Sequence, residues 1–481
     1  MSINTKCQVF TPKEHVQKML DFVGYTNNIF GKKVAENSCG DGNILCEIVS
    51  RYIIDGINQN YSLKKIKKSL EANVWAAEID KVHIKNCVHR LNEIAAKYGI
   101  SNVKWNIIQG DFLKQNIKNE FDFVIGNPPY ISYQELDEKT RKFVKENFKT
   151  CIEGKFDYCY AFIEASLKSL KCTGKLAYLI PINIFKTRFA SKLREYIIRY
   201  LECIYDYTNK KIFEGKLTAS AIIVCNKANS TAQIKYHDLN NNINYFINKN
   251  DLTGKWIFKN RDNVSCETEN AATFGDYFHT ATCIATQCNP AYILSDYKEQ
   301  GEYVHVDEYK IEKNLVRKAI SPRSINYKKD ELVIFPYYYK NGDLCRYTEK
   351  EFKEKYPFGY RYLLRFKDKL DKRDSDKGIC WFEYGRSQAL AHLNQSKLMI
   401  STLITKSVNT IILDKEMIPT SGLYIISLDE AKYSLAKAEE ILKSALFLEY
   451  VREVGIISNG NSFRISCTDI NNFRFPKDML G

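Results

Sequence analysis

Four consecutive residues carry the strongest chemical signal in this 481-residue sequence. Asn127, Pro128, Pro129 and Tyr130 follow the short apolar run 121–126. The two prolines fix consecutive φ angles and lack an N–H group, so the Pro128 carbonyl is held in one direction as an acceptor. Asn127 adds a side-chain carbonyl oxygen, and Tyr130 adds a flat ring. The tetrapeptide therefore offers two acceptors and a stacking surface, a combination that suits a planar exocyclic amine.

An exocyclic amine on an aromatic ring is a poor nucleophile, because its lone pair is delocalised into the ring. Two hydrogen bonds accepted from its N–H groups favour a more tetrahedral nitrogen and free the lone pair for attack, so no general base is required. The alternative interpretation is an ordinary Pro-Pro turn after a strand. The complete run Asp-Phe-Val-Ile-Gly-Asn-Pro-Pro-Tyr over residues 122–130 is far more specific than Pro-Pro alone and favours the chemical interpretation.

Three acidic residues end successive predicted strands before Asn127. They are Glu36, Glu78 and Asp111. In a doubly wound sheet, ligands bind beyond the carboxyl ends of the strands, so we expect the three acids and Asn127 at one edge. Glu78 is expected to accept hydrogen bonds from ribose hydroxyls, as an acid at that position does in dinucleotide folds. For one acid alone, a solvated carboxylate is the better explanation, but the succession favours a binding site.

The Asn127–Tyr130 motif resembles that of amino-group methyltransferases that use S-adenosyl-L-methionine, above all the gamma class of DNA adenine-N6 methyltransferases. Residues 33–43, Lys-Val-Ala-Glu-Asn-Ser-Cys-Gly-Asp-Gly-Asn, resemble the first motif of this family. Its glycines let the backbone approach a ligand closely, and its acid suits the cationic methionine portion of the cofactor. Residues 7–12 resemble the N-terminal cofactor motif. Residues 212–220 resemble the loop that supplies a second aromatic ring against a flipped base.

The resemblance implies both a catalytic and a cofactor-binding set. Asp111 resembles the residue that binds the cofactor's adenine amine, and Phe213 is the candidate second aromatic, with a buried core position as its alternative. The catalytic set is Asn127, Pro128, Pro129, Tyr130 and Phe213. The cofactor-binding set is Phe10, Thr11, Pro12, Glu36, Cys39, Gly40, Gly42, Glu78, Ile79, Asp111 and Asn127.

The elements that position these residues follow from the pattern of the first half. Short β-branched runs alternate with helical patterns, which predicts an α/β, doubly wound, Rossmann-like methyltransferase sheet. The expected strands are 33–36, 74–80, 103–110, 121–126, 175–181, 204–207 and 220–225. The expected helices include 44–54, 83–98 and 158–170. The Asn- and Lys-rich stretch 55–73 is expected to be an irregular excursion.

A polar, Asn-rich stretch over 228–251 suits a domain boundary. We therefore expect a catalytic, cofactor-binding domain over 1–245 and a DNA target-recognition domain over 246–481. The second domain is expected to be α+β, because segments 283–293, 315–325 and 333–338 resemble the family's target-recognition domains. Apolar residues between 431 and 451 fall on one helical face and are expected to pack in a core.

Composition limits the remaining possibilities. Residues 1–250 hold 37 basic and 25 acidic side chains, whereas residues 251–481 hold 34 and 32, so the net charge of +14 lies mostly in the first half. This imbalance slightly favours a polyanionic partner, here double-stranded DNA. The 15 cysteines form no Cys-x-x-Cys pair, and a metal site is not expected. No run reaches the ~18 apolar residues of a membrane span, so we expect a cytoplasmic protein.

Other functions remain open at this stage. Asn-Pro-Pro-Tyr on such a fold also resembles protein-glutamine and RNA methyltransferases, and a catalytically silent DNA-binding subunit is a further alternative. The large basic chain with its second domain favours site-specific methylation of duplex DNA, because a flipped base requires surrounding duplex contacts. A fused nuclease is not favoured, since the two expected domains use the whole sequence. A separate cognate restriction endonuclease remains open as a partner.

Overall fold

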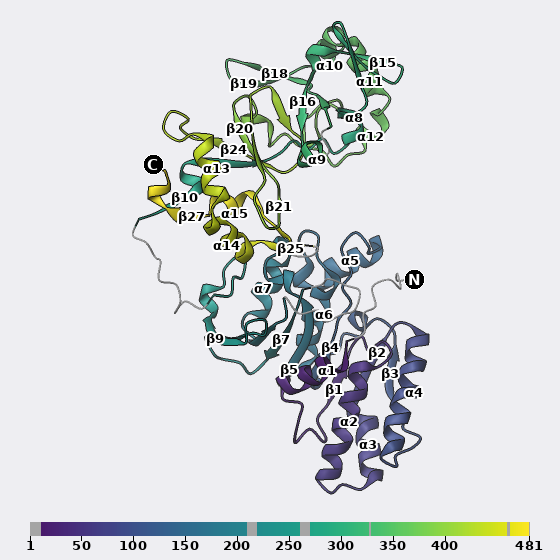
Figure 1. Cartoon of the computed structure of the whole chain (residues 1–481). Helices are drawn as coiled ribbons and strands as arrows, with labels where there is room; N and C mark the ends of the chain where they lie inside the picture. Colours follow the sequence, from purple (N-terminus) through teal and green to yellow (C-terminus); the bar gives the residue numbers. More distant parts are fainter. Residues whose placement is uncertain (1–10, 209–218, 260–269, 327–328, 459–461, 481) are drawn as a thin grey trace. The chain divides into compact units, whose positions relative to one another are not determined.

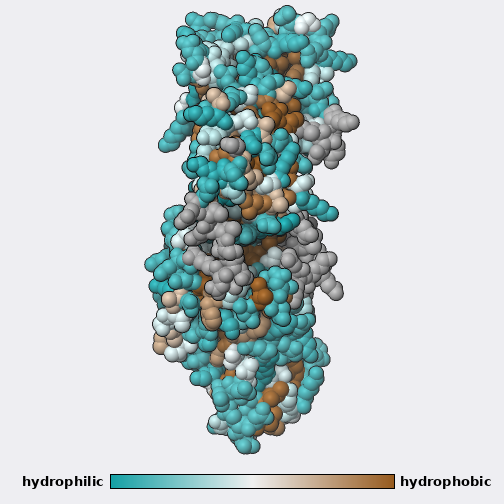
Figure 2. All heavy atoms as spheres, turned by 60° about the vertical axis from the view of Figure 1, so that its left-hand side comes forward, coloured by the Kyte–Doolittle hydropathy of each residue, from teal (hydrophilic) through white to brown (hydrophobic). Residues whose placement is uncertain are grey.

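The computed structural model describes residues 11–208, 219–259, 270–326, 329–458 and 462–480. It divides the chain into two compact units, Met1–Ser265 and Cys266–Gly481 (Figure 1). Each unit has its own buried core. Hydrophilic residues dominate the face drawn in Figure 2, and hydrophobic residues form small groups among them.

A nine-stranded sheet organises the first unit, with the order β3-β2-β1-β4-β5-β7-β6-β8-β9. Strands β1 to β5 are parallel to one another, whereas β7 runs antiparallel to both β5 and β6. The predicted doubly wound α/β sheet is confirmed. The strands are β1 (Val34–Glu36), β2 (Val74–Glu78), β3 (Asn106–Gln109), β4 (Phe121–Gly126), β5 (Leu170–Pro181), β6 (Leu201–Asp206), β7 (Ser220–Asn226), β8 (Gln233–Asp238) and β9 (Ile243–Asn248).

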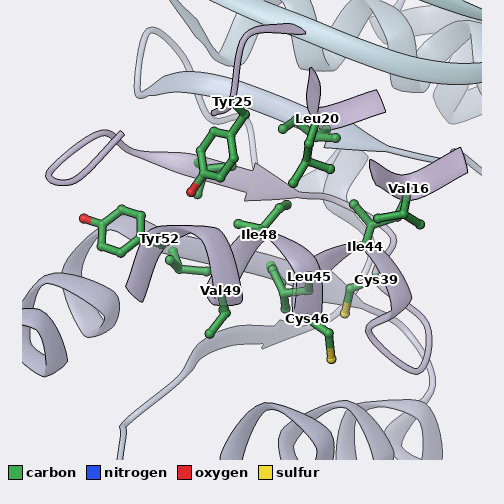
Figure 3. Close-up of a cluster of buried hydrophobic side chains, with 14 of the residues drawn as sticks. Val16, Leu20, Tyr25, Cys39, Ile44, Leu45, Cys46, Ile48, Val49 and Tyr52 are labelled. Carbon is green, nitrogen blue, oxygen red and sulfur yellow. The ribbon is translucent and has the colours of Figure 1, made fainter. Parts of the chain in front are cut away.

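Helices cover both faces of this sheet. One face carries α1 (Lys13–Val23), α2 (Asn43–Asn58), α3 (Leu63–Asn73) and α4 (Lys81–Lys97), whose apolar side chains share one core with β1, β2 and β4. Figure 3 shows part of this core, where Val16 and Leu20 of α1 lie near Ile44 and Ile48 of α2. Beyond β4 the chain forms α5 (Glu138–Asn147), α6 (Tyr158–Ser169) and α7 (Ser191–Ile197), and α6 packs on β5.

Two segments of the first unit differ from the sequence-based expectation. The stretch 55–73 is largely helical: α2 continues to Asn58, and α3 begins after Ser62, whose side chain accepts a hydrogen bond from Lys65 N. The Asn-rich stretch 228–251 contains β8 and β9, which pair as the last hairpin of the sheet. The division between the two units therefore falls some twenty residues after the expected boundary, which would cut through β9.

The second unit is α+β, and its described residues form six small sheets. The larger sheets have four strands each: one consists of β11 (Phe278–Thr282), β24 (Leu423–Ser427), β20 (Lys397–Ile400) and β22 (Thr410–Leu413), and the other of β12 (Ile293–Leu294), β17 (Glu331–Ile334), β16 (Val316–Ile320) and β23 (Met417–Pro419). Sheets of three strands are formed by β13 (Lys298–Gln300), β14 (Tyr303–Val306) and β15 (Tyr309–Glu312), and by β21 (Leu403–Ile404), β26 (Ser462–Arg464) and β25 (Ile456–Ser458). The remaining strands pair two by two: β10 (Ala271–Thr273) with β27 (Arg474–Pro476), and β18 (Tyr337–Lys340) with β19 (Asp343–Arg346). The aromatic stretch 333–339 lies in β17 and β18, and most of its side chains are buried.

The helices of the second unit are α8 (Asn289–Tyr292), α9 (Pro322–Asn326), α10 (Glu349–Lys355), α11 (Pro357–Leu364), α12 (Lys367–Asp371), α13 (Leu435–Lys443), α14 (Ala445–Val454) and α15 (Cys467–Asn471). The single helical face expected over 431–451 is divided between α13 and α14. The division falls at Ser444, whose side chain accepts a hydrogen bond from Phe447 N and so starts a new helix. The expected core packing is confirmed, since Leu435, Ile441 and Val451 share one buried cluster.

Candidate active site

The candidate site lies at the carboxyl ends of the parallel strands β1, β2 and β4. Strand β1 is paired with β2 on one side and with β4 on the other. The chain order therefore reverses at β1, and such a switch point leaves a crevice at the carboxyl edge of an α/β sheet. Glu36 and Glu78 end β1 and β2, and Asn127 follows β4 directly. The sheet thus brings these three predicted residues to one edge.

The Asn127 amide is oriented by Thr11, which is distant in the sequence, and by the nearby Tyr130. Its Nδ2 donates to Thr11 Oγ1 at 3.3 Å, and its Oδ1 accepts from the Tyr130 hydroxyl. Thr11 is buried, with 3% of its surface exposed, so its hydrogen bond fixes the orientation of the amide nitrogen. These contacts assign which amide atom is the acceptor, and that acceptor is the atom expected to bind an amine.

The Tyr130 hydroxyl has a choice of acceptors. Besides Asn127 Oδ1, it lies 2.6 Å from the Leu179 carbonyl oxygen on β5. A hydroxyl has one proton, so it donates to only one of these oxygens at a time. Burial raises the pKa of the Tyr130 phenol well above its usual value, so the proton stays on the oxygen at neutral pH. Tyr130 can therefore release Asn127 Oδ1 and keep a hydrogen bond to β5.

Tyr130→Phe is expected to destabilise the protein by about 0.5–1.5 kcal/mol, the usual net contribution of one hydrogen bond. The change keeps the ring but removes the donor that serves Asn127 and Leu179. Urea denaturation of both proteins measures the difference. Tyr133→Phe is the matched control, because no described residue binds the Tyr133 hydroxyl. Equal stability of Tyr130→Phe and the wild type would contradict the hydrogen bond to β5.

The backbone of Asn127 is fixed by the loop after β1. Ser38 Oγ donates to the Asn127 carbonyl oxygen at 3.1 Å. Beside it, Asn37 is 2% exposed, and its Nδ2 donates to Ser166 Oγ at 2.6 Å while its Oδ1 accepts from Tyr178 at 2.7 Å. This buried network joins the ends of β1 and β5 to α6. Sequence reasoning missed it, since nothing in the spacing of these residues indicates that they meet.

The turn after β1 requires glycine for steric reasons. Gly40 and Gly42 have φ angles of +50° and +83°, in the region that other residues rarely adopt. A Cβ atom on Gly42 would also lie 2.6 Å from Cys87 Sγ on α4. Cys39, predicted at this turn, is buried, and its backbone N–H donates to the Ala77 carbonyl at 3.1 Å. Packing against α4 therefore selects the residues of this turn.

A residue of α4 supports the glycine turn from outside. Arg90 Nη1 donates to the Asp41 carbonyl at 2.8 Å and to Asn43 Oδ1 at 2.6 Å. Asn43 Nδ2 in turn donates to the Thr11 carbonyl at 3.2 Å. A series of hydrogen bonds thus links Arg90 through the turn and Thr11 to Asn127. No sequence pattern indicates this role for Arg90, because its partners lie about fifty residues away.

Glu78 accepts three backbone hydrogen bonds. Its Oε2 accepts from Gly40 N at 2.8 Å, and its Oε1 accepts from Ile79 N at 2.8 Å and from Asp80 N at 2.9 Å. The carboxylate therefore joins the end of β2 to the glycine turn. Ile79 beside it is 38% exposed, an unusual position for an isoleucine at the end of a central strand. Glu78 and Ile79 therefore offer a polar and an apolar surface side by side at the carboxyl edge of the sheet.

Glu36 is buried without full hydrogen bonding. It is 2% exposed, and its Oε2 has no hydrogen-bond partner in the described parts of the chain. Burial is the main cause that raises the pKa of this carboxyl well above its usual range, and the backbone of Leu45 at the start of α2 partly offsets it. A buried acid of this kind is stabilised by a cation placed beside it.

Asp111 begins the short helical turn η2 (Phe112–Lys114). Its Oδ1 accepts from Leu113 N at 3.0 Å, and its Oδ2 accepts from the Tyr158 hydroxyl at 3.1 Å. Burial is the main cause that raises the pKa of Tyr158 well above its usual value, with the Asp111 charge as a second cause. Tyr158 is therefore a neutral donor to Asp111 and a residue that sequence reasoning missed.

Of the remaining predicted residues, Pro12, Pro128 and Pro129 belong to the described parts of the chain. Pro12 precedes α1, and its carbonyl accepts from His15 N and Val16 N at 3.0 and 3.1 Å. Pro128 is buried, and Pro129 is partly exposed. Phe10 and Phe213 lie outside the described residues, so neither position is placed. Within the described ranges, no group of three or more His, Cys, Asp or Glu side chains is arranged to hold a metal ion.

The Asp157 carboxyl lies at the N-terminus of α6, near the Tyr130 phenol. It accepts a hydrogen bond from Cys159 N at 3.0 Å, and burial is the main cause that raises its pKa to about 6. An acid whose pKa is raised in the folded state binds protons more tightly there, so its contribution to stability is present below pH ~4 and lost as the pH rises through about 6.

Asp157→Asn is expected to make the protein more stable than the wild type above about pH 6, by roughly 1–3 kcal/mol. Asparagine caps a helix as well as aspartate does and never ionises. Urea denaturation across pH 4 to 8 measures the difference between the two proteins. Near pH 4 the two stabilities are expected to converge. Parallel profiles over the whole range would contradict a raised pKa at Asp157.

Comparison with known proteins finds a family model that matches the part of the chain containing most of this site. Residues 33–213 match the family model described as Eco57I restriction-modification methylase. This range includes Asn127, Pro128, Pro129 and Tyr130. The expected relationship to restriction-modification methyltransferases is confirmed. Among the described helices, none combines the length and apolar composition of a membrane-spanning segment.

Two curated relatives cover parts of the chain. The type II restriction enzyme and methyltransferase RM.Eco57I of Escherichia coli is 26% identical in an alignment 381 positions long, which covers 70% of this chain and 38% of that protein. The type II methyltransferase M.BstVI of Geobacillus stearothermophilus is 30% identical in an alignment 230 positions long, which covers 44% of this chain and 40% of that protein. The chain thus spans about two fifths of the length of either relative.

One solved structure resembles the chain over nearly its whole length. It is the type IIL restriction-modification enzyme MmeI, solved in complex with DNA. The match has a TM-score of 0.56 with 13% sequence identity and covers 96% of this chain and 64% of the other. At this identity the similarity concerns the fold, and it extends over both units.

Proposed function

We propose that this chain, whose residues 33–213 match the Eco57I restriction-modification methylase family, is a site-specific DNA methyltransferase. It transfers a methyl group from S-adenosyl-L-methionine to the N6 amine of an adenine that has left the duplex. The observation that carries the proposal is the oriented Asn127 amide beside Pro128 and Tyr130, at the same sheet edge as Glu36 and Glu78.

The chemistry of the edge fits S-adenosyl-L-methionine. Glu36 is a buried carboxyl group, and one of its oxygens has no partner among the described residues; the cationic methionine portion would stabilise its charged form. Glu78 and Asp111 offer acceptors for the ribose hydroxyls and the adenine amine, and the exposed Ile79 offers an apolar contact to the adenine face. When bound, the cofactor supplies an electrophilic methyl group on its sulfonium. Gly40 and Gly42, with Cys39, Thr11 and Pro12, are proposed to line the same site.

The residues of the tetrapeptide orient the amine and do not deprotonate it. Asn127 Oδ1 and the Pro128 carbonyl each accept a hydrogen bond from one N–H of the amine, which makes the nitrogen lone pair available for attack on the methyl group. Tyr130 stacks on the extruded base and shifts its own proton from Asn127 Oδ1 to the Leu179 carbonyl. Neither amide oxygen is basic enough to take a proton at neutral pH, so the rate is expected to depend on geometry.

The second unit is proposed to read the target sequence. The first unit carries most of the net positive charge of the sequence and is proposed to bind cofactor and the DNA backbone. A separate cognate restriction endonuclease is proposed as a partner, because methylation of the target site would protect the DNA from cleavage by that enzyme. Protein-glutamine, RNA and silent-subunit alternatives stay open as outcomes of the test below.

Nucleoside mass spectrometry on DNA from cells that express the chain and lack other methyltransferases tests this function. N6-methyladenine is the expected product, and long-read mapping of the modified bases identifies the target site. N4-methylcytosine would overturn the choice of base and keep the amine mechanism. Unmodified DNA together with methylated RNA or protein would favour the alternatives. Cells that express Asn127→Ala provide the control.

A further inference from the structure

An exposed aromatic ring lies where two loops of the first unit meet. One loop contains residues 152–155, between η3 (Lys149–Cys151) and α6, and the other follows β5 and contains η5 (Arg188–Ala190). Phe189 is 39% exposed. A Cβ atom on Gly154 would lie 2.3 Å from Phe189 Cδ1, and Gly154 has a φ of +68°. The first loop is therefore shaped to seat the ring of the second.

The loop that carries Phe189 is firmly held. Arg194 of α7 is 4% exposed and donates to the Ile184 and Thr187 carbonyls, both at 2.8 Å. Trp256 N donates to the Phe185 carbonyl at 2.8 Å, and the two rings are stacked with centroids 5.8 Å apart. The exposure of Phe189 is thus a property of a fixed loop.

The loop after β5 leaves the sheet at the edge of the candidate site, and the segment before α6 is hydrogen-bonded to that edge. Tyr158 N donates to the Ile131 carbonyl at 3.0 Å, which ties the segment before α6 to the residue after Tyr130. Strand β5 pairs with β4, and its Leu179 carbonyl lies within hydrogen-bonding distance of Tyr130. Phe189 is therefore presented on the same side of the sheet as the tetrapeptide.

The two segments that meet at Phe189 carry basic side chains that have no partner among the described residues. The side chains of Lys149, Lys155 and Arg188 are exposed, and none of these three side chains forms a hydrogen bond or ion pair with any described residue. Glu153 is the acidic neighbour on the first loop, and Ile152 beside it is 50% exposed. An exposed ring among cations that lack partners matches the chemistry of DNA, which offers base faces and phosphates together.

We propose that Phe189 stacks on a DNA base that loses its neighbour when the target adenine leaves the duplex, and that Lys149, Lys155 and Arg188 contact the flanking phosphates. This inference rests on the proposed function, because it assumes that the tetrapeptide receives an extruded base. It adds a second stacking surface to that of Tyr130, on the part of the DNA that remains in place.

Binding of the full chain to two fluorescein-labelled duplexes tests the proposal. Both contain the mapped target site, and in one of them the target adenine faces an abasic position, so that it leaves the duplex easily. Phe189→Ala is expected to weaken binding to the abasic duplex about tenfold and to the paired duplex less. Phe189→Trp is expected to stay near the wild type. Affinity unchanged by Phe189→Ala would overturn the proposal.

Phe189→Leu is a control for a folding defect in Phe189→Ala, because leucine still packs on Gly154 but lacks a ring. It is expected to bind like Phe189→Ala, and binding as tight as that of Phe189→Trp would overturn stacking. Phe246→Ala is the matched control, because Phe246 is 63% exposed on the edge strand β9. A wild-type chain that methylates no DNA would remove the proposed function itself, whereas normal methylation by Phe189→Ala with unchanged affinity would remove only this inference.

The cationic residues have a separate readout. Arg188→Ala and Lys155→Ala are each expected to reduce the slope of log affinity against log salt by about 0.9, the value for one lost phosphate contact. Lys68→Ala on α3 is the control, since α3 leads into the amino end of β2, away from this edge. Unchanged slopes in both loop variants would overturn the phosphate contacts.

Discussion

Asn127→Ala is expected to lower kcat about a hundredfold or more, while the affinities for S-adenosyl-L-methionine and duplex DNA stay within about twofold of the wild type. The Asn127 carbonyl oxygen matters most as the amine nitrogen becomes tetrahedral, so its loss affects the transition state more than the bound ground state. Single-turnover transfer of a tritiated methyl group to DNA measures this step without interference from product release.

The structure indicates that this variant keeps its fold. Tyr130 retains the Leu179 carbonyl as an acceptor when the Asn127 side chain is removed. Asn92→Ala is the matched control, because Asn92 Oδ1 also accepts one hydrogen bond, from Trp105 Nε1 at 2.8 Å, on exposed surface of the same unit. Asn92→Ala is expected to turn over normally. Normal turnover by Asn127→Ala would remove the proposed mechanism.

Much of the first unit is predictable from the sequence because its strands have a strong local signal. Val74–Glu78 is a short apolar run that ends in a carboxylate, and Phe121–Gly126 is a similar run that ends in the tetrapeptide. A fully buried parallel strand reads as a continuous apolar run. Polar residues at the ends of such runs fall on one edge of the sheet, so Glu36, Glu78 and Asn127 were correctly expected there.

The elements that sequence reasoning misread have weak or mixed patterns. In α3 only Ile66 and Leu70 are buried, so lysines dominate its composition. In β8 the buried residues Ile234 and Tyr236 alternate with polar ones, and the surrounding asparagines hide this period. Such segments fold as they do because the sheet and α2 offer a surface to cover. Tertiary packing of this kind is not visible in a local window.

The hydrogen bonds that orient the site were also beyond the sequence. Thr11 contacts Asn127 across 116 positions, and Tyr178 contacts Asn37 across 141. Tyr130 was expected to act through its ring, whereas the structure adds two acceptors for its hydroxyl. Motifs indicate which side chains approach a ligand, but the residues that hold those side chains become visible only when the strands are paired.

Glu78→Gln is expected to weaken S-adenosyl-L-methionine binding roughly tenfold to more than a hundredfold, because hydrogen bonds to a charged group contribute about 1.5–3 kcal/mol. The carboxylate accepts from Gly40 N with one oxygen and from Ile79 N and Asp80 N with the other. An amide presents an NH₂ group in place of one oxygen, so one of these N–H groups would face another donor. Calorimetric titration of the cofactor measures the loss.

Asp80→Asn is the matched control for this variant. It removes an equal charge two residues away, and asparagine can still accept the hydrogen bond that Asp80 Oδ1 receives from Val82 N at 2.7 Å. Its cofactor affinity is expected to stay at the wild-type level. Titration with 5′-methylthioadenosine, which keeps the ribose and lacks the amino-acid portion, then locates the effect. A contact to the ribose predicts that Glu78→Gln weakens binding of this nucleoside as much as binding of the cofactor. Wild-type affinity for both ligands would show that Glu78 supports the glycine turn alone and does not contact the cofactor.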